Sequence, residues 1–309
     1  GGSVWIFLGP AMLMMALGVL LIPGIDAIAK LLSASISPGQ VSWGRFVFQT
    51  LFMLPLVLAG SRGRPLRLSA RRIGWDALRG ALLGAATLFF FSSLKHLPMA
   101  DAISIFFVEP LILTLLSALF LGEQIGWRRL SAILIGFCGA LVIVRPSWQV
   151  FGWAAVLPMA AACCFALYMT VTRHAAKAAD PASMQLWAGV FGALILSAAL
   201  AVGDSAAIAF LHPSWPSARE WLLLALLGAI ATSGHLLVVM ALRRAPAGIL
   251  APFQYLEIIS ATLLGLVIFG DFPDLTTWFG VSVVVGSGLY VFHRERRLAR
   301  APLPAAEHP

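Results

Sequence analysis

Two glutamates, Glu109 and Glu257, lie in the middle of long apolar stretches, and the residues around them repeat at a spacing of about 148 positions. An ionised acid at the centre of a membrane-spanning helix costs about 2.5–3.5 kcal/mol on insertion scales, so each side chain should face protein or water. In a water-filled cavity the carboxylate could bind a substrate ammonium group or carry a proton. Packed in the protein, a neutral glutamic acid could instead hydrogen-bond to a neighbouring helix. The sequence leaves both alternatives open.

Other side chains in or near the apolar stretches combine an apolar body with a polar tip. His235 could donate a hydrogen bond to a substrate carboxylate or titrate near neutral pH, although a hydrogen-bonded core histidine fits the sequence as well. Aromatic walls with a few polar groups suit an amphipathic solute, whereas phenylalanines are also common in packed interiors. The predicted cavity residues are Glu109, Glu257, His235, Tyr255, Gln254, Phe90 and Tyr168.

Charged residues and prolines predict a gate or hinge. Asp26 and Lys30 are four residues apart, so they share a helix face and can pair. Arg45 lies a turn or so into the next apolar stretch from the same side, where its planar fork could attract a carboxylate. A plain interfacial salt bridge is the alternative. Pro110 and Pro252 each remove a backbone donor inside an apolar stretch, which suits either a hinge or a static bend.

No combination of residues predicts an enzyme. The sequence lacks both the phosphate-binding loop of ATPases and the His-Glu-x-x-His pattern of metalloproteases, and no local motif assembles a nucleophile, a base and an orienting group. The three cysteines lie in apolar stretches without metal-ligand spacing. We therefore expect no catalytic residue, no metal site and no cofactor.

The composition places these residues in a membrane. Of the 309 residues, 60% are hydrophobic and 11% are charged, which leaves too little polar surface for a soluble globule. A helix needs roughly 20 mostly apolar residues to cross a bilayer, and continuous apolar runs favour helices over the alternating strands of a barrel. We predict an all-α membrane protein with ten transmembrane helices, at about residues 8–31, 39–59, 73–94, 98–121, 126–144, 152–173, 184–202, 219–242, 246–269 and 275–293.

The ten predicted helices form two homologous sets of five. Pro98 and Pro246 keep the 148-residue spacing of the glutamates, and an earlier pair, Lys30 and Arg173, is 143 residues apart. Because five is odd, the second set must enter the membrane in the opposite orientation, which gives the inverted repeat of many secondary transporters. The predicted domains are two inverted five-helix repeats, residues 8–145 and 152–294, and a disordered cytoplasmic tail, residues 298–309.

Basic residues predict the orientation. Most of the 21 lysines and arginines lie in the connections after the second, fourth, sixth and eighth predicted helices and after the last one, while Arg45 and Arg79 fall inside helices. Basic residues favour cytoplasmic loops, so both termini should be cytoplasmic. The net charge of +8 follows from this topology and does not indicate nucleic-acid binding. We expect a multi-pass protein of the bacterial inner (plasma) membrane.

One segment, residues 108–146, resembles the repeated module of the drug/metabolite transporter superfamily of the EamA type. The second copy keeps its mid-span glutamate and its span-ending glycine, but lacks a proline directly after the glutamate. The resemblance covers roughly residues 8–297. Its motifs in the first copy are Glu109-Pro110 in mid-span, Leu121-Gly122-Glu123 at the span end, and a glycine-containing helix that closes with Arg145-Pro146.

This resemblance implies a ten-helix carrier in which both halves enclose a central cavity. A likeness to the YddG-type exporters leads us to expect a secondary transporter that exports aromatic and other amino acids and small amphipathic metabolites by alternating access. Uptake of S-adenosylmethionine, riboflavin or a similar metabolite is the alternative within transport, and a non-transporting membrane scaffold is the alternative outside it. The expected partners are a small-molecule substrate and membrane lipid, without nucleic acid. The GxxxG pattern of Gly80 and Gly84 predicts a close helix contact, which a monomer can supply.

The predicted orientation can be tested by cysteine labelling in a variant whose native cysteines are replaced by alanine. Arg67→Cys and Arg297→Cys should react with a membrane-impermeant maleimide only from the cytoplasmic side, because both belong to the basic connections. Lys95→Cys, on the other predicted side, is the control and should react in intact cells. Labelling of position 67 or 297 in intact cells would contradict the topology.

Overall fold

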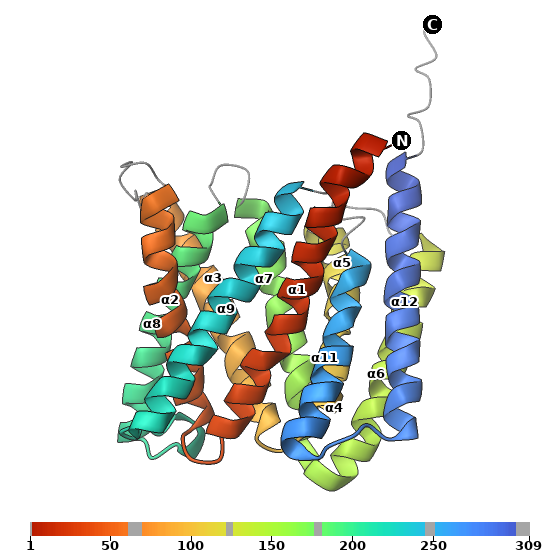
Figure 1. Ribbon diagram of the computed structural model, residues 1–309. Helices are drawn as coiled ribbons and strands as arrows, with labels where there is room; N and C mark the ends of the chain where they lie inside the picture. The colour runs from red at the N-terminus through yellow and green to blue at the C-terminus, as the bar shows by residue number, and fades with distance from the viewer. Residues whose placement is uncertain (1, 61–69, 122–125, 176–180, 245–250, 301–309) are drawn as a thin grey trace, which may run out of the picture.

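The computed structural model describes residues 2–60, 70–121, 126–175, 181–244 and 251–300, and throughout these ranges the regular structure is helical. The helices run between the two ends of one bundle, and the first helix begins at the same end at which the last helix finishes (Figure 1). The second helix begins at Pro38 because Ser37 caps it: the Ser37 hydroxyl accepts the Gln40 N–H at 3.2 Å. The first three helices are α1 (Gly2–Leu32), α2 (Pro38–Gly60) and α3 (Ala70–Leu94).

The segment predicted as one helix over residues 98–121 is interrupted in the structure. It forms two helices, α4 (Met99–Phe106) and α5 (Glu109–Leu121), with a two-residue break between them. Pro110 has no N–H to donate to the carbonyl of Phe106, and its ring crowds that turn. The predicted span is present as one apolar stretch, and the hinge or bend expected at Pro110 is a break between two helices directly before Glu109.

The next apolar stretch, Leu130–Thr172, is 43 residues long and folds back on itself. Gly152 has a φ of 61°, in the left-handed region that glycine adopts without strain, and the chain reverses direction there. Two antiparallel helices result, in agreement with the two helices predicted at residues 126–144 and 152–173. They are α6 (Trp127–Phe151) and α7 (Leu157–Ala175), joined by the short 3-10 helix η1 (Gly152–Val156).

The remaining elements follow the other predicted apolar segments. Ser217 and Glu220 cap the start of α9 reciprocally, with Ser217 N donating to Glu220 Oε2 at 2.6 Å and Glu220 N to Ser217 Oγ at 3.3 Å. The elements are α8 (Pro181–Ser205), η3 (Ala209–Leu211), α9 (Ala218–Arg244), η4 (Ala251–Tyr255), α11 (Leu256–Leu264), the π-helical η5 (Gly265–Phe269) and α12 (Leu275–Arg300).

The C-terminal helix is longer than predicted. It continues to Arg300, so residues 298–300 of the predicted disordered tail are helical, and residues 301–309 lie outside the described residues. Its start is fixed by Asp274, whose Oδ1 accepts the Thr277 N–H at 2.7 Å. Basic residues in the last turns of a helix complement its dipole, which suits the Arg-rich end of α12.

Length and composition qualify seven stretches of the described chain as candidate membrane spans, and two shorter apolar helices, Phe253–Phe269 and Leu275–Val291, accompany them. Large apolar side chains lie exposed on the outside of the bundle, including Leu119 and Val267, which are 77% and 80% exposed. An apolar exterior of this kind suits lipid better than water.

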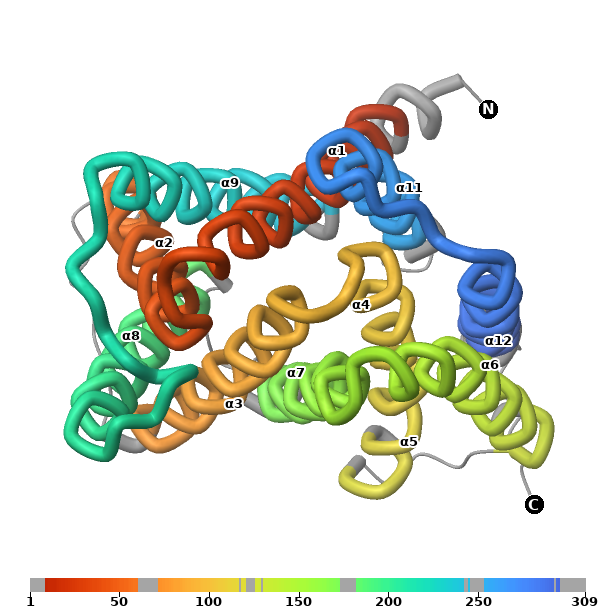
Figure 2. Tube along the Cα trace, turned by 90° about the horizontal axis from the view of Figure 1, so that it is seen from below, coloured from red at the N-terminus to blue at the C-terminus, as the bar shows by residue number. Residues whose placement is uncertain are grey.

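The helices pack in a closed arrangement around α4. α1 packs along α9 and α11, while α7 packs along α3 and α5. α2 contacts α8 and α9, and α3 contacts α8. α6 and α12 pair with each other at one side of the molecule (Figure 2). A shared apolar core of residues from both halves of the chain joins α1, α3, α4 and α9.

The contact between α3 and α8 depends on Gly80. A Cβ atom at this position would lie 2.7 Å from the Phe191 Cβ and 2.8 Å from the Gly192 backbone nitrogen, so only glycine fits. Gly84, the other residue of the GxxxG pattern, has more room, because its nearest neighbours are Leu196 atoms at 3.9 Å. The close contact that this pattern predicted is present within one chain.

We expect Gly80→Ala to lower the melting temperature of the detergent-solubilised protein, because overpacking costs about 1–3 kcal/mol. Gly84→Ala is the matched control on the same helix. It should be neutral or stabilising, since alanine favours a helix over glycine by about 0.5–1 kcal/mol. Equal melting temperatures for the two variants would show that Gly80 does not set the α3–α8 distance.

Candidate functional site

Four charged or titratable side chains from four helices come together in the interior. Asp26 of α1 interacts electrostatically with Arg45 of α2, Arg45 also with His235 of α9, and Asp26 also with Glu257 of α11. These four residues are called the charged cluster. Because α1 and α2 precede the chain reversal at Gly152 and α9 and α11 follow it, the charged cluster joins both halves of the chain.

Arg45 is the cation of the charged cluster. Its Nη1 donates to Thr87 Oγ1 at 2.8 Å, and its guanidinium lies 5.6 Å and 6.0 Å from the ring centroids of Phe46 and Phe91. Its Nε is buried and meets no acceptor within the described chain. A buried donor left without a partner costs about 1–3 kcal/mol. A carboxylate on a bound solute could supply the acceptor.

The charged cluster lies deep within the bundle, yet it is not sealed. Asp26 is only 7% exposed, whereas Arg45, His235 and Glu257 are half-buried and retain accessible surface. His235 Nδ1 lies 2.7 Å from the Ala231 carbonyl oxygen, so the hydrogen on Nδ1 is used within α9 and Nε2 is left to accept.

An aromatic row lies beside the charged cluster. Tyr168 and Phe165 of α7, Phe106 of α4 and Phe90 of α3 follow one another with ring centroids 5.4–5.7 Å apart, which is ordinary aromatic packing. Tyr168 also interacts electrostatically with Arg45. Phe90 and Tyr168, both predicted as cavity residues, thus belong to one continuous apolar wall. We call these four rings the aromatic row.

Glu109 lies at the contact between two other elements of the fold, α5 and η4. It is 9% exposed at the start of α5 and interacts electrostatically with Tyr255. The Tyr255 ring packs 5.5 Å from the Phe107 ring, and its hydroxyl fills the space that a side chain at Gly288 of α12 would need. Glu109 and Tyr255 therefore share the contact between α5, η4 and α12.

The other predicted cavity and hinge residues have simpler surroundings. Gln254 is exposed in η4 and contributes nothing to the charged cluster. Pro110 lies in the first turn of α5, and Pro252 lies in η4, its side chain outside the described residues. Helical geometry changes beside each proline, since α4 gives way to α5 at the first and the 3-10 helix η4 gives way to α11 near the second.

Lys30 does not pair with Asp26 as the four-residue spacing suggested. Its Nζ lies 3.4 Å from Asp271 Oδ2, donates to the Leu97 carbonyl and lies over the Phe269 ring. Asp101 lies near enough to interact electrostatically with Lys30 and Asp271. These contacts tie α1 and α4 to the connection before α12, at the end of the bundle opposite the start of α1 (Figure 1).

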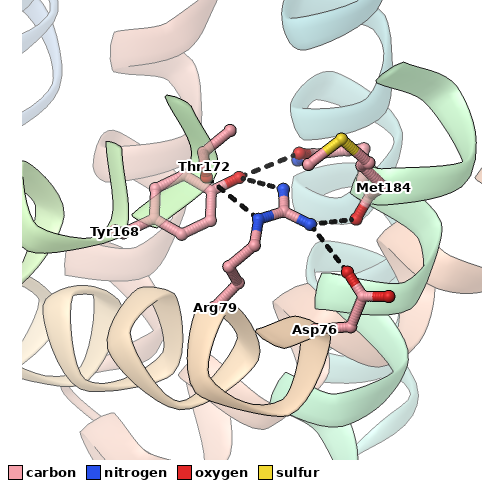
Figure 3. A network of polar contacts seen from close by, with 6 residues as sticks. Asp76, Arg79, Tyr168, Thr172 and Met184 are labelled. Carbon is pink, nitrogen blue, oxygen red and sulfur yellow. Dashed lines mark hydrogen bonds and ion pairs between the residues drawn. The ribbon is translucent and has the colours of Figure 1, made fainter. Parts of the chain in front are cut away.

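Arg79 lies inside a helix, as predicted, but no function was predicted for it from the sequence. Its side chain is 1% exposed and lies between α3, α7 and α8 (Figure 3). Nη1 contacts Asp76 Oδ1 at 3.1 Å and the Met184 carbonyl at 2.9 Å, Nε donates to Thr172 Oγ1 at 2.9 Å, and Nη2 to the Tyr168 hydroxyl at 3.3 Å. A hint was available, because Asp76 and Arg79 are three residues apart on an apolar helix.

A separate groove of about 350 Å³ lies between α6 and α12. It includes Arg128, Ser131 and Tyr290 together with apolar side chains. No residue of the charged cluster or of the aromatic row lines it. The groove and the charged cluster are therefore two separate candidate places for a solute, and only the charged cluster brings a cation and acids together.

Comparisons with known proteins give a consistent result. The sequence profile of the EamA-like transporter family matches residues 9–145 and, a second time, residues 152–292. A riboflavin transporter of Rhizobium johnstonii is 27% identical over 266 residues, which cover 85% of this chain and 83% of that protein. An S-adenosylmethionine uptake transporter of Rickettsia conorii is 26% identical over 275 residues, covering 88% of each. A solved crystal structure shares the fold, with a TM-score of 0.63 at 22% identity over 93% of this chain and 98% of that chain.

The position of Lys30 can be tested by cross-linking in the background without native cysteines. Lys30→Cys combined with Asp271→Cys should be joined by a short bifunctional thiol reagent, because the native side chains are in contact. Asp26→Cys combined with Asp271→Cys is the control and should remain unlinked. The opposite pattern would contradict the contact between Lys30 and Asp271.

Proposed function

The chain belongs to the EamA-like transporter family, and from this premise we propose that it is a secondary carrier that moves a zwitterionic metabolite with an aromatic body by alternating access. It is a multi-pass membrane protein, and its relatives are transporters of small metabolites, not enzymes. The proposal adds the inverted ten-helix architecture, the location of the site and the chemistry of the solute.

The packing pattern supports two inverted five-helix repeats, residues 8–145 and 152–294. α1 packs on α9 and α11, and its counterpart α7 packs on α3 and α5, so exchanging the halves maps one set of contacts onto the other. α1 and α7 also run in opposite directions through the bundle (Figure 1). Carriers with this design let one half adopt the conformation that the other half leaves.

The charged cluster supports a solute with both a positive and a negative group. Arg45 is the cation of the charged cluster, and the planar fork of a guanidinium suits a carboxylate. Asp26 and Glu257 are the acidic members and could accept from an ammonium group. This pair of requirements describes an α-amino-acid head, which aromatic amino acids and S-adenosylmethionine share.

The aromatic row supports an aromatic or heterocyclic body. A solute ring that packed against one of these four rings would gain about 0.5–1.5 kcal/mol beyond the area that the pair buries. Export of aromatic amino acids is therefore the first candidate function. Uptake of S-adenosylmethionine or riboflavin is the second, and the names of the relatives favour it.

Counterflow into liposomes tests the proposed function. The purified chain should exchange labelled phenylalanine, tryptophan or S-adenosylmethionine, and exchange should weaken for analogues that lack the carboxylate. Exchange of riboflavin alone would show that the amino-acid head is not what the site recognises. No flux for any of these solutes would favour a protein that does not transport them.

We expect Arg45→Met to raise the half-saturating solute concentration at least tenfold, because removing one member of a buried charge pair costs about 2–5 kcal/mol. Arg128→Met, on the exposed surface of α6, is the control and should leave exchange unchanged. Equal kinetics for both variants would exclude Arg45 from the site.

The two glutamates should respond differently to conversion to glutamine. Glu257→Gln alters the charged cluster, so we expect a changed solute affinity or a changed pH dependence of exchange at an unchanged folded yield. Glu109 instead interacts with Tyr255 at the contact between α5, η4 and α12, so we expect Glu109→Gln to have the smaller effect on solute affinity. Loss of folded yield with Glu257→Gln would assign that residue a structural role instead.

A further inference from the structure

We propose that Arg79 is a positioning residue for transport, which fixes Tyr168 at one end of the aromatic row and so sets the shape of the solute site. The inference rests on the proposed function, because the aromatic row is there assigned to the solute. Arg79 itself touches no residue of the charged cluster among its recorded partners. Its influence on the site must therefore pass through the residues that it holds.

The bonds to Arg79 leave its guanidinium little freedom. All three nitrogens are engaged, and the acceptors come from three helices: Asp76 of α3, Thr172 and Tyr168 of α7, and the Met184 carbonyl of α8 (Figure 3). A planar guanidinium bound on several edges also fixes the groups that it binds. α3 is in this way bonded to α7 and α8, which come from the other half of the chain.

Tyr168 belongs both to this network and to the aromatic row. Its hydroxyl accepts from Arg79 Nη2 and donates to Gln185 Oε1 at 3.2 Å, and the Arg79 guanidinium lies 5.4 Å from its ring centroid. The same ring packs on Phe165 and interacts with Arg45. Because the hydroxyl is held from two sides, the ring is fixed where the aromatic row begins.

Among the described residues, the positions that correspond to this network in the other half are apolar. The 148-residue spacing places Leu224 and Leu227 opposite Asp76 and Arg79, and the 143-residue spacing places Ile25 opposite Tyr168. All three counterparts are buried and belong to the apolar core. An apolar contact therefore suffices to pack the equivalent helices. Replacing a buried ion pair by apolar residues is often neutral or stabilising, so stability alone does not explain why a polar network is present here.

The test compares solute affinity with stability. Asp76→Leu combined with Arg79→Leu reproduces the apolar pair of the other half. We expect this double variant to keep the wild-type melting temperature to within a few degrees. Its half-saturating solute concentration in counterflow should rise about 2- to 30-fold. Arg79→Leu alone should instead lower the melting temperature, because it leaves Asp76 buried without its cation. Leu227→Met is the matched control and should change neither quantity.

Two further variants keep the inference testable if the double variant fails to fold. Thr172→Val removes the acceptor for Nε, and Tyr168→Phe removes the hydroxyl while keeping the ring. Each should weaken solute affinity. Adding Tyr168→Phe to the double variant should cause little further loss, because both changes act through the same ring.

The outcomes separate this inference from the proposed function. Absence of exchange by the wild-type protein would overturn the function itself. Normal exchange by the wild type with unchanged half-saturation in the double variant, or in Thr172→Val and Tyr168→Phe where the double variant does not fold, would overturn the positioning role. Strictly additive effects of Tyr168→Phe and of the double variant on half-saturation would also contradict it, since they would show that the two changes act independently.

Discussion

Charged side chains inside a membrane protein must be paired or solvated, because each costs about 2.5–3.5 kcal/mol at the centre of a helix on insertion scales. Inside this bundle Asp26 of α1 and Arg45 of α2 attract each other, whereas Asp26 and Glu257 of α11 are two acids that repel each other when both are ionised. The packing of α1 against α2 therefore has an electrostatic part as well as an apolar one. A solute that supplies an acceptor to Arg45 and a donor to the carboxylates would replace part of this interaction. A solute can shift a conformational equilibrium only by such a difference in interaction.

The two halves share their helix order but not their polar residues. Helical geometry changes at corresponding places, directly before Glu109 and close before Glu257. Yet Glu257 joins the charged cluster while Glu109 meets Tyr255, and Arg79 faces three helices where the other half has an apolar contact. The repeated scaffold offers two related arrangements of the same helices. The polar side chains that differ between the two halves determine which groups contact the solute and how tightly the helices of each half are bonded to one another.

The helical segments could be predicted from continuous apolar runs, because these act over short distances along the chain. Sequence reasoning failed where the partner is distant along the chain. Asp26 and Lys30 share a helix face, but the side chain that pairs with Lys30 is Asp271, on a connection more than 200 residues away. The break before Glu109 could be anticipated from Pro110 as a loosened turn, though not as two separate helices. Arg79 was visible as a charge in an apolar helix, and only the assembled bundle reveals its acceptors.

The most direct measurement is a structure of the protein in lipid nanodiscs with an exchanged solute bound. We expect density for the solute beside Arg45, between the charged cluster and the aromatic row, with its carboxylate accepting from the guanidinium. Density confined to the groove between α6 and α12, with Arg45 still bonded to Thr87 alone, would contradict a solute site where the two halves meet.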